Sequence, residues 1–160
     1  MEFSVEAPDV EELSEGSPLE LVVQNALLKL RAVPGGLVLA VDSMVVWDGS
    51  AHGKPADAAE AEAGLRELSG RWHEVMGGIA IRADGEERTD VAVTRVRFRE
   101  LAEADIERYL ASGEWRDRAG GYAIQELGAM LVEGIEGDYF NVVGLPVPAL
   151  LRLLPGLLHS

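Results

Sequence analysis

The sequence predicts a single α/β domain in which helices flank a mixed, twisted β-sheet. Two observations lead to this fold class. Extended apolar segments alternate with amphipathic segments along the chain, and two long extended segments meet at Asp84-Gly85 as in a hairpin. The length of 160 residues suits one domain with a sizeable core. No repeat, low-complexity tract or long linker divides the chain, so residues 1–160 are expected to form one domain.

The N-terminal part of the chain predicts a strand, a loop and a helix. Glu2 to Glu6 alternate polar and apolar side chains, as in a half-buried strand, and an acidic loop follows Pro8. Ser17-Pro18-Leu19-Glu20 combines a hydroxyl cap, a proline at the first helical position and a glutamate that completes a capping box. Apolar residues then recur at helical spacing, so we expect a helix that ends before Pro34.

The next segment predicts a strand and a second helix. Leu37 to Val41 is fully apolar, which is typical of a strand covered on both faces, and Met44 to Trp47 continues it. Asp57 to Glu60 repeats the capping pattern and predicts a helix that ends near Ser69-Gly70.

The rest of the chain predicts a hairpin, a further strand and two helices. Asn141 to Pro146 is interpreted as a buried strand end and turn with a structural role, and His73 as a structural histidine at the start of a strand. The expected strands cover Trp72–Ala83, Asp90–Phe98 and Ala129–Ile135, and the expected helices cover Leu101–Leu110 and Pro148–Leu154.

Composition excludes several classes of function. The formal net charge of −14 would repel a nucleic-acid backbone, so we expect no nucleic acid as partner. The absence of cysteine excludes disulfides, thiolate metal sites and cysteine nucleophiles. No apolar run has the length of a membrane span, and the acidic start lacks the pattern of a secretory signal. A cytoplasmic protein without a membrane partner is therefore expected.

Asp42 is a candidate for catalysis or metal binding because it interrupts an apolar run. A carboxylate at such a position is costly unless it is paired, solvated or bound to a cation. A metal ligand or general base at the end of a strand is one interpretation. The alternative is an aspartate that only caps the strand end.

Lys54 is a second candidate, in the segment His52-Gly53-Lys54-Pro55. Glycine lets the backbone approach a ligand closely, and the proline restricts Lys54 to extended conformations, which would aim its ammonium group at a phosphate. The alternative is a solvated loop lysine. The segment lacks the spacing of a P-loop.

The segment Arg116 to Gln125 combines two arginines, a pair of glycines and an amide. Arginine forks suit phosphate oxygens, and a glutamine amide can read a base edge through its donor and acceptor groups. Arg116 and Arg118 are thus candidates for phosphate contacts. The alternative is a surface loop that contains an Arg–Asp pair.

Taken in order, these segments resemble the Maf family of nucleoside triphosphate pyrophosphatases over nearly the whole chain. Within these segments, the sequences GGYAIQ (120–125) and NVVGLP (141–146) resemble those of the family branch that acts on dTTP and UTP. The matching segments are AVDSMVV (40–46), GKPAD (53–57), EA (60–61), LSGRWHEV (68–75), TRVRFREL (94–101), YLASGEWRDRAGGYAIQ (109–125) and EGDYFNVVGLP (136–146).

The resemblance implies a fold like that of inosine triphosphate pyrophosphatases, with a central cleft, and hydrolysis of a nucleoside triphosphate to the monophosphate and pyrophosphate with Mg²⁺ or Mn²⁺. It implies that Asp42 is the proton acceptor and a metal ligand, and that Lys54 contacts phosphate. It further implies that Gln125 and Ser43 affect specificity and that Glu12 is an acidic residue and metal ligand at the cleft. A link to septum formation and a homodimer are also implied.

The chain departs from the family pattern at its start and at two further positions. Relatives normally open with a strand and a loop of serine, proline and paired arginines that grips phosphates, which this sequence lacks. Gly77 stands where threonine is usual, and Glu126 where glycine is usual. We expect a start codon assigned downstream of the true one. The alternatives are a short, weakly active or inactive nucleotide-binding relative, and a partner protein linked to cell division.

Overall fold

The structure is a computed structural model that describes residues 3–159. Its centre is a five-stranded sheet in the order β2-β1-β3-β4-β5. The strands are β1 (Val38–Trp47), β2 (Ser50–His52), β3 (Trp72–Ala83), β4 (Glu86–Phe98) and β5 (Val132–Glu136). The α/β class is confirmed, but every strand pair among the described residues is antiparallel, so the expected mixed sheet is not observed. Alternation of strands and helices along a sequence does not reveal whether a connection crosses the sheet or returns at the same end.

The predicted hairpin is confirmed and is longer than expected. β3 and β4 pair from Trp72–Arg97 to Ala83–Glu86, and the turn residues Asp84 and Gly85 have φ angles of 53° and 80°. Two consecutive positive φ angles are the requirement of a type I′ turn, which matches the twist of the flanking strands.

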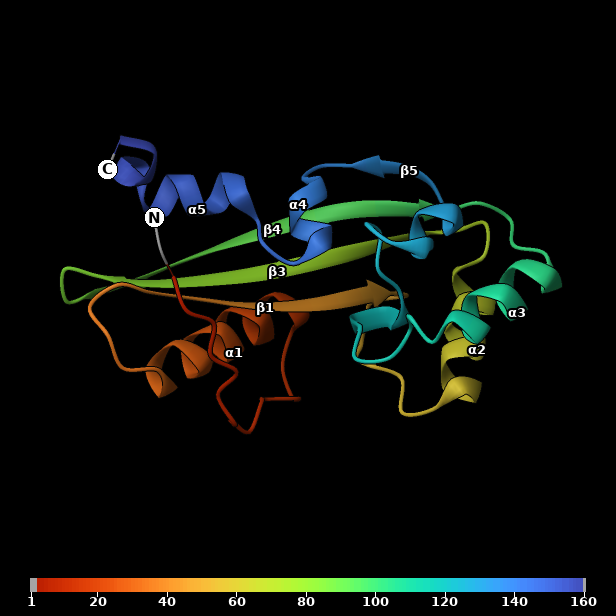
Figure 1. The fold of residues 1–160 in the computed structure, drawn as a ribbon, viewed down its shortest axis with the longest axis horizontal. Helices are drawn as coiled ribbons and strands as arrows, with labels where there is room; N and C mark the ends of the chain where they lie inside the picture. The colour runs from red at the N-terminus through yellow and green to blue at the C-terminus, as the bar shows by residue number, and fades with distance from the viewer. Residues whose placement is uncertain (1–2, 160) are drawn as a thin grey trace.

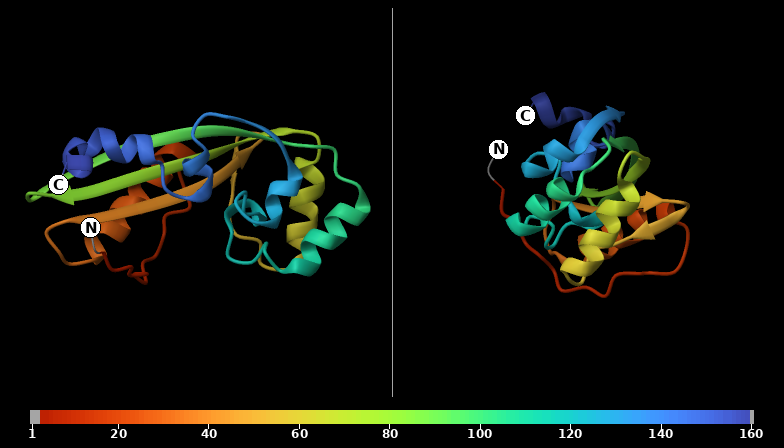
Figure 2. Two further views of the ribbon diagram at one scale, coloured as in Figure 1. Left: turned by 45° about the horizontal axis from the view of Figure 1, so that its top comes forward. Right: turned by 90° about the vertical axis from the view of Figure 1, so that its right-hand side faces the viewer.

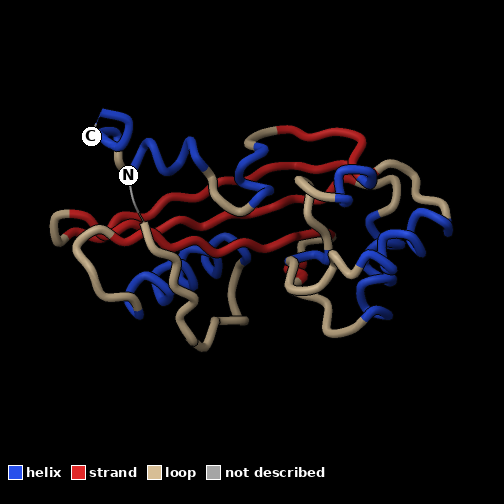
Figure 3. Tube along the Cα trace, in the orientation of Figure 1, coloured by secondary structure: helices blue, strands red, loops and turns tan. Residues whose placement is uncertain are grey.

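The molecule is elongated, and β1, β3 and β4 run along much of its length (Figures 1 and 3). In one half, α1 (Pro18–Ala32) covers one face of the sheet, and α4 (Tyr139–Val143) and α5 (Val147–Leu153) lie on the other. Successive side chains of β3 point to opposite faces of the sheet, since Ala80 packs with α1 and Ile79 packs with α5. A Cβ at Gly78 would overlap the backbone of Val22, so this glycine lets α1 lie directly on the strand.

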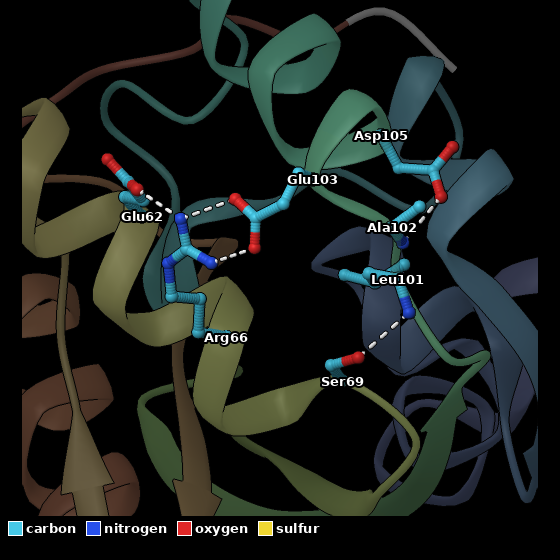
Figure 4. Close-up of polar contacts among 7 residues, drawn as sticks. All are labelled: Glu62, Arg66, Ser69, Leu101, Ala102, Glu103 and Asp105. Atoms are coloured by element: carbon cyan, nitrogen blue, oxygen red, sulfur yellow. Dashed lines mark hydrogen bonds and ion pairs between the residues drawn. The ribbon is translucent and has the colours of Figure 1, made fainter.

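The other half of the molecule carries α2 (Ala58–Leu68) and α3 (Glu103–Ser112), beyond the end of the long strands (Figure 2). Arg66 of α2 pairs with Glu62 one turn away and with Glu103 of α3 (Figure 4). Ser69 accepts a hydrogen bond from the backbone of Leu101 at 2.8 Å. The ion pairs are exposed and add little stability, so the apolar core around Leu65 and Tyr109 holds this half together.

The predicted helices are confirmed with small shifts of their ends. Ser17 accepts a hydrogen bond from the backbone of Glu20 and caps α1, and Asp57 does the same for Glu60 in α2. The helices expected over Leu101–Leu110 and Pro148–Leu154 are α3 and α5.

Four predictions about strands need correction. Phe3 to Glu6 form no strand, and Phe3 is 83% exposed, because this stretch has no sheet neighbour against which its apolar side chains could pack (Glu2 lies outside the described residues). Leu39 is 42% exposed, so the first half of β1 is not covered on both faces. Residues 129–131 belong to the 3₁₀ segment Leu127–Leu131, and β5 begins only at Val132. Asn141 lies in the short helix α4 rather than at a strand end.

Among residues 3–159, no helix combines the length and the apolar character needed to cross a membrane.

Candidate active site

A cavity of about 410 Å³ lies against the middle of β1. Val41 to Val45 all contribute to its lining, because β2 pairs only with Val45 to Trp47 and leaves the preceding edge of β1 accessible. The lining also draws on α1, on the loop after β2 and on the loop that contains Gln125. From these elements come Lys29, Lys54, Asp117, Arg118, Tyr122 and Gln125, and Glu12 reaches the cavity from the segment before α1.

Asp42, Lys29 and Glu12 form a charged trio in this cavity, with Lys29 between the two carboxylates. Lys29 of α1 places its Nζ 2.6 Å from Oδ1 of Asp42 and 2.8 Å from Oε1 of Glu12. Asp42 is 6% exposed, whereas the Glu12 side chain is half exposed. One ammonium group therefore joins a buried carboxylate to a carboxylate at the cavity mouth.

Burial and pairing act in opposite directions on the ionisation of this trio. Burial raises the pKa of Asp42 above its usual value, although the hydrogen bond and charge of Lys29 oppose that shift. Burial would lower the pKa of Lys29, but its hydrogen bonds to Asp42 and Glu12 outweigh burial and raise it. Lys29 is thus held as a cation, and Asp42 is a stronger base than an exposed aspartate.

The second oxygen of Asp42 indicates what the cavity can hold. Oδ2 is buried and has no hydrogen-bond partner among the described residues. A buried carboxylate oxygen requires a proton donor or a cation. Asp42 and Glu12 fit a divalent cation whose other ligands come from phosphate and water, as Mg²⁺ prefers. Within residues 3–159 no group of three or more histidine or acidic side chains forms a complete cation site by itself.

Lys29 was not identified from the sequence. It occupies an ordinary position in an amphipathic helix, and its only signal was that it is one of two lysines in the chain. Its partner Asp42 is 13 residues away, so only the packing of α1 on β1 brings the two together.

Most of the predicted site residues line the same cavity. Ser43 follows Asp42 on β1, and Lys54 and Gln125 are exposed side chains on two loops that meet there. A backbone hydrogen bond of 3.0 Å from Gly120 to Gly53 joins these loops. Arg118 also lines the cavity, whereas the Arg116 guanidinium lies over the ring of Trp115, 4.7 Å from its centroid, outside the lining.

The loop that carries Gln125 is held by two buried or partly buried hydrogen-bonding groups. Tyr109 of α3 accepts a hydrogen bond from the backbone of Ala123 at 3.2 Å. Glu114 accepts from the backbones of Leu127 and Gly128, both at 2.9 Å. These bonds hold the backbone on both sides of Gln125. The exposed side chain of Gln125 therefore projects from a backbone that is fixed in place.

His73 supports the same loop from within the core. Its Nε2 lies 2.7 Å from the hydroxyl of Tyr122, and Phe98 packs edge-on against both rings. Burial lowers the pKa of His73 to about 4, so the ring is neutral near pH 7. Because this ring is 2% exposed and its Nε2 contacts a side chain of the cavity wall, it supports the site without taking part in its chemistry.

Comparison with known proteins shows which proteins the chain resembles. The family described as Maf-like protein matches residues 1–157. A dTTP/UTP pyrophosphatase of Dictyoglomus thermophilum is 43% identical over 169 aligned positions, which cover 100% of this chain and 88% of that protein. The dTTP/UTP pyrophosphatase of Symbiobacterium thermophilum is 46% identical, over 95% of this chain and 81% of its own. The dTTP/UTP pyrophosphatase of Pyrococcus furiosus is 41% identical, over 90% of this chain and 78% of its own.

Proposed function

Because the chain belongs to the Maf-like protein family, we propose that it hydrolyses dTTP, UTP or related nucleoside triphosphates to the monophosphate and pyrophosphate. The observation that carries the proposal is the position of Asp42. Its buried carboxylate has a raised pKa and an unpartnered oxygen, and it lies in the cavity that Lys54 and Gln125 also line.

In this proposal Asp42 is the proton acceptor. Hydrolysis requires a water molecule to add at the anhydride between the α- and β-phosphates, the P–O bond there to break, and the proton of the water to leave. A buried carboxylate with a raised pKa is suited to accept that proton at neutral pH. Lys29 balances the charge of Asp42 and orients its carboxylate through the 2.6 Å contact to Oδ1, so Oδ2 is the oxygen that can face the metal and the water.

Lys54 and Arg118 are proposed to hold the triphosphate. Both are exposed cations that line the cavity, and a cation near the phosphates stabilises the charge that develops on the leaving pyrophosphate. We assign this role to Arg118 rather than Arg116, because the guanidinium of Arg116 stacks on Trp115.

Gln125 and Ser43 are proposed to select the base, with Glu12 and Asp42 as ligands of a divalent metal, Mg²⁺ or Mn²⁺. The amide of Gln125 presents both a donor and an acceptor to a base edge. A bound metal would neutralise phosphate charge and lower the pKa of a water molecule.

The test is release of pyrophosphate from dTTP, UTP and GTP by the purified chain, with and without Mg²⁺ or Mn²⁺. We expect metal-dependent release that is faster with dTTP and UTP than with GTP. Absence of release from all three nucleotides, together with absence of metal-dependent nucleotide binding, would contradict the proposal and favour a protein that acts through its surface, such as a partner in cell division.

We also propose that two copies of the chain associate along β1. Leu37 and Leu39 are 56% and 42% exposed on this side of the sheet, and apolar side chains at an accessible strand edge favour association. Sedimentation equilibrium should give a dimer that Leu39→Lys converts to a monomer. An unchanged mass in that variant would place the contact elsewhere.

A further inference from the structure

Glu12 reaches the charged trio from a segment without regular secondary structure. Residues 3–16 form neither helix nor strand, and their side chains are mostly exposed. Even so, the Glu12 carboxylate lies 2.8 Å from Lys29. A surface ion pair contributes too little free energy to order such a segment by itself, so another contact must hold it.

That contact is the side chain of Asn25. Its Oδ1 accepts a hydrogen bond from the backbone N–H of Leu13 at 2.7 Å, and its Nδ2 donates to the carbonyl of Leu13 at 3.1 Å. One amide thus satisfies both backbone groups of one residue, as a neighbouring strand would. Asn25 is 0% exposed, and a buried amide with two satisfied hydrogen bonds is costly to disrupt.

The spacing along α1 links this contact to the active site. Asn25 and Lys29 are four residues apart and therefore lie on the same side of the helix. Asn25 binds the backbone of Leu13, and Lys29 binds the side chain of the preceding residue, Glu12. We propose that Asn25 is a positioning residue that fixes Glu12 against Lys29 and thereby sets the arrangement of the carboxylates around the cavity.

The positional part of the inference is tested without substrate. Hydrogen exchange of the Leu13 amide, followed by NMR, should accelerate at least tenfold in Asn25→Ala, because its acceptor is lost. Val22→Ala is the matched control, since Val22 is also on α1 and 0% exposed but makes no contact of this kind. It should destabilise the helix without a selective change at Leu13. Leu13 exchange that is equal in Asn25→Ala and in the unmodified protein would overturn the inference.

The effect on turnover rests on the proposed function and is tested by a double-mutant cycle with Glu12→Gln. With dTTP, Asn25→Ala alone should lower kcat/KM roughly tenfold, the change expected when one or two hydrogen bonds no longer position a group. In the Glu12→Gln background, Asn25→Ala should lower kcat/KM by clearly less than in the unmodified protein, and the remaining loss measures the direct effect of Asn25 on Asp42, whose pKa Asn25 helps to lower. Equal losses in both backgrounds would show that Asn25 acts on Asp42 or on the fold and not through Glu12, and would overturn the inference.

The two proposals fail in distinguishable ways. A chain that releases no pyrophosphate but shows the selective change at Leu13 contradicts the proposed function and supports the positioning by Asn25. If the Asn25→Ala variant hydrolyses dTTP at the normal rate and its Leu13 amide exchanges as in the unmodified protein, the proposed function is supported and the positioning role of Asn25 is contradicted.

Discussion

Lys29 and Asp42 form an ion pair in which Nζ lies 2.6 Å from Oδ1, and α1 is thereby joined to β1 inside the cavity. The same ammonium group contacts Glu12, so one lysine balances two carboxylates. Since Asp42 is 6% exposed, removal of Lys29 would leave a buried carboxylate without its partner.

Lys29→Gln should therefore lose both activity and stability. We expect turnover to fall at least about 100-fold and the free energy of unfolding to fall by roughly 1–3 kcal/mol, the cost of an unsatisfied buried group. Urea denaturation measures the second effect. The matched control is Lys54→Gln, the other lysine, which is exposed and should change stability by less than about 0.5 kcal/mol while also impairing turnover. Equal stability of the two variants would contradict the role of the Lys29 pair.

Asp42→Asn should abolish pyrophosphate release with little effect on folding. The substitution removes the proton acceptor at nearly constant volume, and Lys29 retains Glu12 as a partner. The free energy of unfolding should change by less than about 1 kcal/mol, because burial already disfavours the charge of Asp42. Steady-state kinetics and thermal unfolding of the same preparation provide both values. A variant with undiminished turnover would show that another group accepts the proton.

Gln125→Glu should change the preference among bases. The substitution replaces the donor of the amide by a second acceptor, so the ratio of kcat/KM for dTTP to that for GTP should shift by about tenfold. Glu126→Gln is the control, since it makes the reverse change at the neighbouring exposed residue, which does not line the cavity. If both variants keep the original ratio, Gln125 does not select the base.

Gly77 and Asn141 should be energetically coupled. A Cβ at residue 77 would overlap Oδ1 of Asn141, whose Nδ2 donates to Val75 and to Thr94, each at 3.0 Å. Gly77→Ala should cost roughly 1–3 kcal/mol in the unmodified protein, because Asn141 must move and lose these bonds. In an Asn141→Ala background the same change should cost almost nothing. Urea denaturation of the four proteins tests this, and equal costs in both backgrounds would mean that the side chains do not compete for space.

His73 should make stability depend on pH in the acidic range. Its pKa is lowered to about 4 in the folded chain from 6.5, so between these values the unfolded chain binds more protons and stability falls as the pH falls. The full penalty, reached below pH 4, is about 3 kcal/mol. His73→Gln removes the titration but can still hydrogen bond to Tyr122, so the variant should gain stability relative to the unmodified protein from pH 7 to pH 4. A pH-independent difference between the two would contradict this assignment.

Short-range signals in the sequence predicted much of the local structure. The cap formed by Ser17, Pro18 and Glu20 and the turn at Asp84-Gly85 depend on residues within three or four positions of one another, so they could be read directly and are confirmed. The order of motifs also identified the family, which the match over residues 1–157 confirms. Asp42, Lys54 and Gln125 were candidates for the same reason, and the cavity brings them together, although their roles stay predictions.

The tertiary structure decided which residues meet. Phe3 and Val5 alternate like a strand but stay exposed, because a strand also needs a neighbour with which to pair. Lys29 and Asn25 carry no local signal, since their partners Asp42 and Leu13 lie 13 and 12 residues away. Such contacts arise only when a helix packs on a sheet. The sequence by itself therefore determined the longer helices, the long hairpin, the family and the catalytic candidates, whereas packing across the sheet determined the ion pair and the amide contact at the candidate site.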